Sequence, residues 1–325
     1  MASKMIGIDI GGNTMKMTVC AGGTVKKAAV SPMPEYLTQD GHIAAPDAMS
    51  DFIKKMLKEN GIRRGDCAMV LPRQIVIATR LSMPVMSEKE LLLNLPFEFR
   101  DFVGKDTNNY DYDYVVCGVE DNMMDIYAAA VRKELVEEYY SIFKKAGLTL
   151  KLAMPAEIAW TNLIRRAKDV PGKICIVDIG HHVTRVNIFS GDNFIMGRSI
   201  EMAGSTINEN IAYEQNVDSF AAHTRKEANA EGVLNADFLQ ETYDTLAMQI
   251  ANILQFFGYS DTSEGGPLEH VYYCGGSSLI EPLRTALHEN TGMTLHHIND
   301  LLKMNEEDKD LALFCSLAAS AAMQK

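Results

Sequence analysis

The sequence predicts an α/β protein of two lobes that share one duplicated fold, with a smaller subdomain inserted into the first lobe. A strand–turn–strand segment near the N-terminus is repeated about halfway along the chain, and in both copies the first strand ends in Asp-Ile-Gly. The element order of residues 73–148 predicts the inserted subdomain. With 325 residues, the chain is long enough to build both lobes around buried cores.

The two copies of the repeat read IGIDIGGNTMKMTV and CIVDIGHHVTRVNIF. In each copy a basic residue stands seven positions after the Asp, so Asp9 precedes Lys16 and Asp178 precedes Arg185. Glycine lets the backbone approach a phosphate without an intervening Cβ, and the N–H groups of such a turn donate to phosphate oxygens. The repeat therefore predicts two phosphate-binding hairpins, one in each lobe.

A third glycine turn lies in YYCGGSSLIEPL, where Gly275, Gly276 and Ser277 separate a buried strand from a helix. Bare backbone at this point can pack against a nucleoside. The P-loop pattern GxxxxGK[ST] and the dinucleotide pattern GxGxxG are both absent from the sequence. The three glycine turns together predict a nucleotide site of a different kind.

Hydrophobic periodicity predicts the individual elements of the first lobe and of the insert. The first lobe should begin with three strands, at residues 5–10, 15–20 and 24–30. A helix should follow, from a cap at Asp47 to Gly61, and then a further strand at residues 67–71. The insert reads strand, helix, strand, strand, helix. Ser87 and Glu90 form a capping box at the start of its first helix, and Pro96 should kink or break that helix.

The second half of the chain predicts another group of three strands, then a long helical region. The strands follow a boundary at residues 171–173, and residues 204–260 are mostly helical. A strand, the third glycine turn and a helix through about residue 290 come next, and a final helix covers residues 309–323. The strand and helix of residues 149–168, which contain Trp160, return the chain from the insert to the first lobe.

These motifs resemble those of a known superfamily. The two Asp-Ile-Gly hairpins and the GGSS turn are similar to the phosphate 1, phosphate 2 and adenosine motifs of actin, sugar kinases and heat-shock chaperones. RLSMPVMSEKELLLNLPFEF, followed by DYDYVVCGVEDNMMDIYAAAVRKELVEEYYSIFKKAGL, resembles the characteristic subdomain of the FtsA/PilM branch, and GRSIEMAGSTI resembles the PilM family of type IV pilus assembly. The resemblance covers about residues 4–322 and implies an actin-like (ribonuclease H-like) fold with a βαββα insert.

The resemblance implies that both lobes contribute to binding ATP and Mg²⁺. The cofactor-binding residues that match the motifs are Asp9, Gly11, Gly12, Asn13, Thr14, Lys16, Asp178, Gly180, Thr184, Gly275, Gly276 and Ser277. Asp9 and Asp178 stand where carboxylates hold the water molecules of a phosphate-bridging Mg²⁺. No catalytic residue is assigned, so we expect ATP to bind and its hydrolysis to be weak or absent.

The resemblance also implies how the chain divides into domains. The first actin-like lobe comprises residues 1–72 and 149–170, and the insert comprises residues 73–148. The second lobe comprises residues 171–205 and 264–325, with a helical subdomain at 206–263.

Two departures from the superfamily pattern concern the nucleotide. His181 and His182 stand in the second phosphate loop, where relatives carry smaller residues. The A-E-x-x-K pattern that contacts ribose is matched by the stretch from Ala221 to Arg225, in which the Glu is missing and Arg replaces Lys. Both departures predict altered nucleotide affinity.

The leading functional hypothesis is a scaffold that binds the short cytoplasmic tail of a membrane-anchored, PilN-like pilus protein. A small-molecule kinase is the first alternative, with Glu157 as the candidate general base. An FtsA-like division tether is the second, although the C-terminal SLAASAAMQK lacks the large apolar and basic faces of a membrane-binding helix. Association of the chain with further copies of itself is a further possibility.

Charge and cysteine usage restrict these hypotheses further. The formal net charge is -12, which argues against nucleic acid and against direct adsorption to an anionic membrane. The six cysteines are widely spaced and mostly lie in apolar runs, so we expect buried, reduced thiols. Without a signal-peptide pattern or a spanning segment, the sequence predicts a cytoplasmic protein that reaches the inner face of the membrane through its partner.

Overall fold

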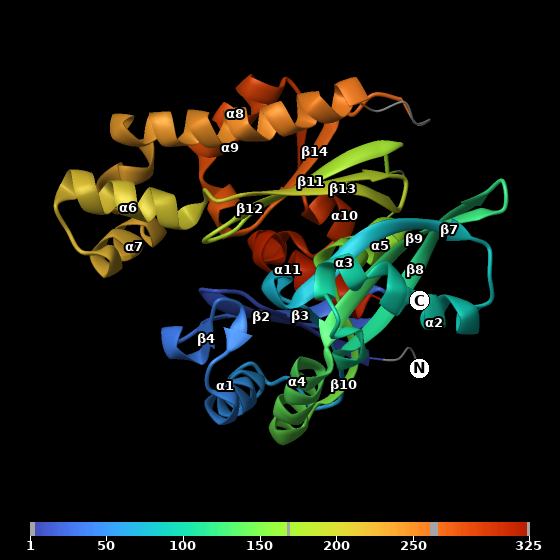
Figure 1. Ribbon diagram of the computed structural model, residues 1–325. Coiled ribbons are helices and arrows are strands. Elements are labelled where there is room, and N and C mark those ends of the chain that lie inside the picture. Colours follow the sequence, from blue (N-terminus) through green and yellow to red (C-terminus); the bar gives the residue numbers. More distant parts are fainter. Residues whose placement is uncertain (1–3, 168–169, 261–265, 324–325) are drawn as a thin grey trace. The chain divides into compact units, whose positions relative to one another are not determined.

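The chain forms two compact units, each built around its own five-stranded sheet (Figure 1). The computed structural model describes residues 4–167, 170–260 and 266–323. The first unit contains the chain up to Asn162 together with the residues from Leu317 onward, and the second contains Leu163–Ser316.

The sheet of the first unit has the strand order β10-β6-β1-β2-β3. Its strands are β1 (Lys4–Ile10), β2 (Thr14–Ala21), β3 (Thr24–Pro32), β6 (Asp66–Val70) and β10 (Thr149–Met154). β1 pairs antiparallel with β2 and parallel with β6, and β6 pairs parallel with β10. The helices α1 (Pro46–Glu59) and α4 (Lys133–Ala146) share the hydrophobic core of this sheet.

The insert carries a separate three-stranded sheet of order β7-β9-β8. Its elements before α4 are β7 (Val76–Pro84), α2 (Glu88–Glu98), α3 (Arg100–Val103), β8 (Tyr110–Glu120) and β9 (Met123–Arg132). The capping box of Ser87 and Glu90 is confirmed at the start of α2. The helix continues through Pro96 to Glu98, and the break falls at Phe99, which separates α2 from α3.

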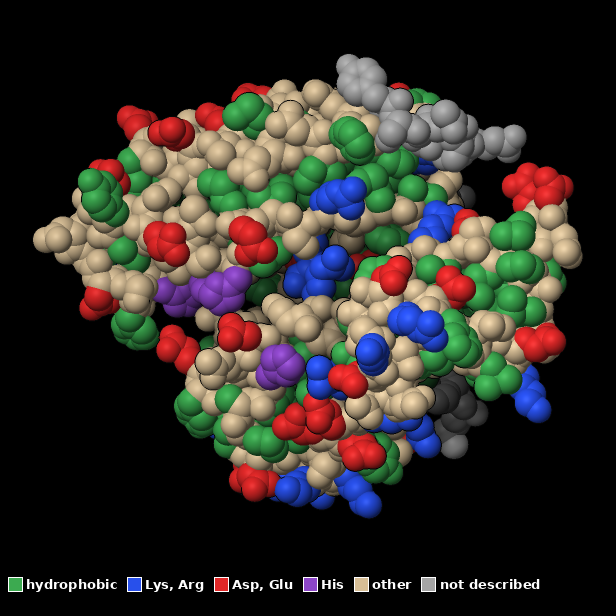
Figure 2. All heavy atoms as spheres, in the orientation of Figure 1, with side chains coloured by type: hydrophobic (Ala, Val, Ile, Leu, Met, Phe, Trp, Pro, Cys, Tyr) green, Lys and Arg blue, Asp and Glu red, His purple; other side chains and the backbone are tan. Residues whose placement is uncertain are grey.

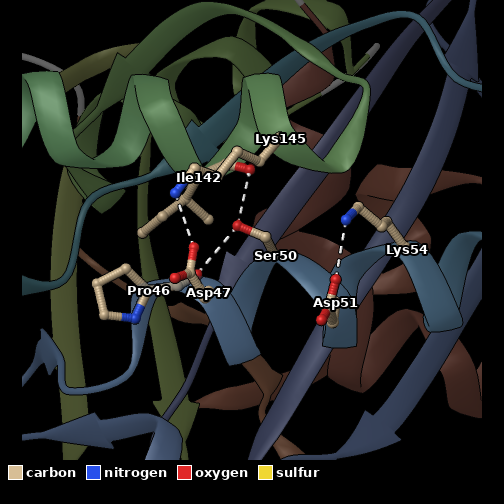
Figure 3. Close-up of polar contacts among 7 residues, drawn as sticks. All are labelled: Pro46, Asp47, Ser50, Asp51, Lys54, Ile142 and Lys145. Atoms are coloured by element: carbon tan, nitrogen blue, oxygen red, sulfur yellow. Dashed lines mark hydrogen bonds and ion pairs between the residues drawn. The ribbon is translucent and has the colours of Figure 1, made fainter.

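The closing helix of the insert, α4, packs against α1 of the first lobe (Figure 3). The buried Ser50 hydroxyl lies 3.2 Å from the carbonyl oxygen of Ile142, and Lys145 donates to the Asp47 carboxylate at 2.7 Å. This hydrogen bond and the positive charge of Lys145 lower the pKa of Asp47. The prediction that Asp47 caps α1 is wrong, because the helix begins one residue earlier, at Pro46, whose fixed φ suits a first turn.

The second sheet repeats the first, in the order β13-β12-β11-β14-β15. Its strands are β11 (Lys173–Ile179), β12 (Thr184–Ser190), β13 (Asn193–Ile200), β14 (His270–Cys274) and β15 (Thr294–His297). As in the first sheet, the central strand β11 pairs antiparallel with the next strand and parallel with a later one. The duplication predicted from the two Asp-Ile-Gly segments is therefore present in the backbone.

The remaining elements are helices and short turns. The helices are α5 (Ala156–Arg166), α6 (Gly204–Gln215), α7 (Ser219–Glu227), α8 (Asp237–Ser260), α9 (Glu281–Thr291), α10 (Asn299–Leu302) and α11 (Lys309–Ala322). Two two-residue strands, β4 (Thr38–Gln39) and β5 (His42–Ile43), form a small ribbon, and 3₁₀ turns occur at Glu35–Leu37, Arg73–Ile75, Thr107–Asn109, Ala230–Asn235, Gly276–Leu279 and Glu306–Asp308.

The C-terminal helix α11 is buried along most of its described length. Its end packs on β1 of the first unit so closely that a Cβ added at Gly7 would lie 1.8 Å from the carbonyl oxygen of Ala318. Among the described residues, no helix combines the length and the apolar character needed to cross a membrane. All six cysteines are free of disulfides and five are buried, as expected.

The contact at Gly7 generates a stability prediction. Gly7→Ala should lower the free energy of unfolding by about 3 kcal/mol, because the new methyl group overlaps the backbone of α11, which cannot rotate away. Gly65→Ala is the matched control, since no atom lies within 4 Å of its added Cβ, and its effect should stay within about 0.5 kcal/mol. Urea denaturation measures both, and equal effects would contradict the tight packing at Gly7.

Candidate nucleotide-binding site

The first phosphate hairpin connects β1 and β2 in the first unit. Asp9 and Lys16 lie directly opposite each other in the strand register and form an ion pair at 3.3 Å, with each side chain 17% exposed. The N–H of Gly11 donates to the carbonyl oxygen of Thr14 at 3.1 Å and closes the turn. A Cβ at Gly11 would lie 2.7 Å from the Lys16 ammonium, so glycine leaves room for this cation at the turn.

The other predicted residues of this hairpin lie at its tip. Gly12 is exposed, and Asn13 and Thr14 are partly buried. The carbonyl oxygen of Asn13 accepts a hydrogen bond from the N–H of Met33 at 3.0 Å, which holds the tip against the end of β3. Backbone hydrogen bonds therefore fix the turn from which the Asn13 and Thr14 side chains project.

The second phosphate hairpin connects β11 and β12 and repeats the geometry of the first. Asp178 is opposite Arg185, and the N–H of Gly180 donates to the carbonyl oxygen of Val183 at 3.2 Å. Thr184 is fully buried, and its hydroxyl donates to the carbonyl oxygen of Met202 at 2.8 Å. The Thr184 side chain therefore supports the loop that leads into α6.

The third glycine turn lies beside the second hairpin, because β14 and β11 are parallel and end at the same edge of the sheet. Gly275 has φ +85° and ψ 151°, a region that only glycine occupies readily. Its added Cβ would lie 2.3 Å from the carbonyl oxygen of Ile179 and 2.6 Å from a carboxylate oxygen of Asp178. The bare backbone that the sequence predicts at this turn is therefore required by the packing.

A single carbonyl oxygen joins three segments of the second unit. Gly180 O accepts from the Ser277 hydroxyl at 2.9 Å and from the N–H of Gly204, the first residue of α6, at 3.2 Å. The structure thus brings Asp178, Gly180 and Gly275–Ser277 together within this unit. Glycine backbone, a carboxylate and a helix N-terminus are groups that suit a nucleotide and its Mg²⁺.

Two neighbouring basic residues lie in different environments on α7, at the end of the stretch that the sequence matches to the A-E-x-x-K pattern. Arg225 donates to the side chain of Gln215 at 2.6 Å, whereas the next residue, Lys226, is buried and donates to the carbonyl oxygen of Gly204 at 3.0 Å. Burial lowers the pKa of Lys226. Shifting the A-E-x-x-K pattern by one position, to Ala222–Lys226, would have retained the Lys and placed His223 at the Glu position.

Glu157, the base proposed for a kinase, is already engaged in the first unit. The side chain is buried, and its carboxylate lies 3.4 Å from Arg73, the residue that precedes the insert sheet. Burial, and secondly the nearby Glu157 carboxylate, raise the pKa of Tyr127 on β9. Glu157 therefore helps to connect the first lobe to the insert, and this engagement argues against a role as general base.

Duplicated sheets, a hairpin of matching geometry in each and a separate insert sheet define an actin-like ATPase fold. A sequence profile described as "Type IV pilus assembly protein PilM" matches residues 7–315, so the chain belongs to the PilM family of type IV pilus assembly proteins.

Solved structures agree with this fold. A structure described as "PilM-PilN type IV pilus biogenesis complex" is 22% identical, with a TM-score of 0.84 over 99% of this chain and 98% of that one. The ethanolamine utilization protein EutJ from Carboxydothermus hydrogenoformans is 12% identical, with a TM-score of 0.63 over 99% of this chain and 89% of its own. No curated protein matches by sequence.

Gly275 offers a direct test of the packing at the site. Gly275→Ala should destabilise the second unit by roughly 3 kcal/mol, because it adds a clash to a backbone conformation that alanine avoids. Gly191→Ala is the control, since its φ of +56° is also positive but its added Cβ meets nothing within 4 Å. Thermal unfolding should show a loss of only about 1 kcal/mol for the control. If both variants lose equally, strain at φ rather than packing explains the glycine.

Proposed function

We propose that the chain is a nucleotide-binding scaffold of type IV pilus assembly that holds the cytoplasmic tail of a PilN-like membrane protein. Membership of the PilM family supports the pathway, and the similar solved structure described as a PilM–PilN complex supports the class of partner. The observation that carries the proposal is the separate β7-β9-β8 sheet, which adds a surface to the actin-like lobe.

In this proposal ATP and Mg²⁺ bind through the two phosphate hairpins and the third glycine turn. The backbone at Gly11, Gly12, Gly180 and Gly275–Ser277 approaches the nucleotide, with Asn13, Thr14 and Lys16 donating to phosphate. Asp9 and Asp178 hold Mg²⁺ through water. Because Glu157 is paired with Arg73 and no other base is assigned, hydrolysis should be weak or absent.

Removal of the Asp9 carboxylate should weaken the binding of Mg²⁺-ATP. We expect Asp9→Asn to raise Kd roughly tenfold, which corresponds to ~1.4 kcal/mol. Asp51→Asn is the control, because Asp51 is 75% exposed on α1, pairs with Lys54 and lies far along the chain from the motif. Isothermal calorimetry measures both. Absence of Mg²⁺-ATP binding by the unmodified chain would refute the nucleotide part of the proposal.

The tail would dock where the insert sheet meets the first lobe. On the face of the insert sheet opposite α2, Val76 and Val131 pack into the first lobe's core, and the next cross-strand pair is Ala78 and Ala129. In the proposal an apolar anchor of the tail would contact these small, partly buried side chains beside Tyr127. Ala78 lies on the edge strand β7, where an extended peptide would also gain backbone hydrogen bonds that offset the entropy lost on ordering.

Recruitment through a tail predicts a difference in liposome flotation. The purified chain should stay in solution with bare liposomes and float with liposomes that carry the tail, with a tail affinity of about -8 kcal/mol, or micromolar. Ala129→Phe should abolish flotation by filling the docking position. Val119→Phe enlarges an exposed residue, 63% accessible, at the far end of the same sheet and should float normally. Equal flotation with bare and tail-bearing liposomes would instead favour direct membrane binding.

This arrangement would keep the chain in the cytoplasm and bring it to the inner face of the membrane only through the partner. The buried position of α11 supports this route, since its apolar residues are used in packing within the fold.

A further inference from the structure

Basic residues gather at one edge of the first unit's sheet, although the chain as a whole is acidic. The parallel strands β1, β6 and β10 all begin at this edge, while β2 ends there and β3 begins there. Three segments that border the edge, residues 22–28, 58–66 and 144–151, carry eight basic residues and two acidic ones. The whole chain has 31 basic and 43 acidic residues, so the edge is opposite in charge to the rest of the chain.

Hydrogen bonds bring these three segments together. The Lys27 ammonium donates to the carbonyl oxygens of Asn60 and Gly61, the latter at 3.3 Å, which joins the start of β3 to the end of α1. The N–H of Thr149 donates to the carbonyl oxygen of Gly65 at 3.0 Å, so β10 begins beside the loop that follows α1. The three segments therefore lie side by side, and we call them the basic edge.

Most of the cations of the basic edge are available to an external partner. Two lysines are used within the fold, because Lys27 holds the end of α1 and Lys145 pairs with Asp47. Figure 2 shows Lys and Arg side chains at the lower margin of the first unit, over α1 and α4. Six exposed cations form no ion pair with any residue that the structure describes, namely Lys26, Lys58, Arg63, Arg64, Lys144 and Lys151.

The composition of the basic edge indicates which kind of anion it fits. Its cations stand on loops and element ends, and none of the buried polar side chains of the described chain lies in these segments, so no enclosed polar group would bind a small ion. The three segments also contain no aromatic residue, whereas single-stranded nucleic acid is bound by stacking on aromatic rings. An extended surface of acidic phospholipids attracts such a cluster without specific contacts.

Salt screening explains how an acidic chain can present this edge to an anionic membrane. In physiological salt the field of a charge falls off within about 8 Å, so the membrane attracts the nearby edge more strongly than it repels acidic residues farther away. The attraction acts in one orientation only. Because the net charge is -12, we expect a second contact to be needed, as in proteins that combine two weak membrane signals.

We propose that the basic edge rests against the anionic surface of the membrane once the partner's tail has bound, and so fixes the orientation of the chain there. The inference rests on the tail docking proposed above. α4 runs from the insert, where the tail would dock, to the basic edge, and its 14 residues span about 21 Å. About seven extended tail residues cover that distance. The bound tail keeps the edge near the bilayer at a high effective concentration, so a weak attraction suffices.

Flotation with two kinds of tail-bearing liposome tests this contact. One kind contains phosphatidylcholine only, and the other also contains about 30% phosphatidylglycerol, which supplies the negative surface potential. The unmodified chain should bind the anionic liposomes about tenfold more tightly, and about 0.5 M salt should remove the difference by screening. Bare liposomes of either composition should leave the chain in solution.

Two matched charge reversals locate the contact. Arg63→Glu with Arg64→Glu should abolish the preference for anionic liposomes, because the loop after α1 then repels them. Lys89→Glu with Lys105→Glu changes the net charge by the same amount at exposed positions of the insert and should retain most of the preference. Both pairs should bind the soluble tail peptide as the unmodified chain does, and thermal melts confirm that each variant is folded.

The outcomes separate this inference from the proposed function. Equal binding to both kinds of tail-bearing liposome, or an equal loss in both variant pairs, would overturn the membrane contact and leave the tail docking intact. Failure of the tail to bind in solution and on neutral liposomes would overturn both. If Arg63→Glu with Arg64→Glu changed the sedimentation of the lipid-free chain while lipid charge had no effect, the edge would be a contact between two copies of the chain, and the membrane contact would be refuted.

Discussion

The structure of both units depends on how the central strand of each sheet is paired. In each sheet the central strand is hydrogen-bonded antiparallel to the strand that follows it and parallel to a strand that returns later. Parallel strands end at the same edge, so the turns after β11 and β14 meet there although Gly180 and Ser277 are 97 residues apart. Open α/β sheets commonly bind ligands outside the carboxyl ends of their strands. The candidate site is thus a consequence of topology before any side chain is considered.

Close approaches between backbone segments also limit which residues fit at two positions. Gly7 under α11 and Gly275 against Asp178 both exclude a methyl group, for different reasons: the first is a packing contact, and the second combines a contact with a glycine-only conformation. Side chains around them can vary while the sheets retain their shape. A solved relative that is only 22% identical has a TM-score of 0.84 with this chain.

The duplication and the long elements were predictable because they leave strong periodic signals. Short elements were missed: β15 and α10 have four residues each and occupy little more than one period. The cap at Asp47 was predicted wrongly, because the helix begins at Pro46 and Asp47 falls inside its first turn, where its carboxylate pairs with the remote Lys145. The meeting of His181 with His223 was also hidden, since it depends on how α7 packs and not on spacing along the chain. Local pattern identified the loops, whereas tertiary contacts decided which residues face each other.

The distribution of cysteines has a practical consequence. Five of the six thiols are buried, and burial raises the pKa of Cys67 to about 12, which suppresses the reactive thiolate. Cys117 alone among them is partly accessible, and it lies near Tyr127, beside the junction of the insert with the first lobe. A thiol-reactive fluorophore would therefore label the unmodified chain at one place. The native sequence supplies a spectroscopic reporter for events at that junction without any engineered residue.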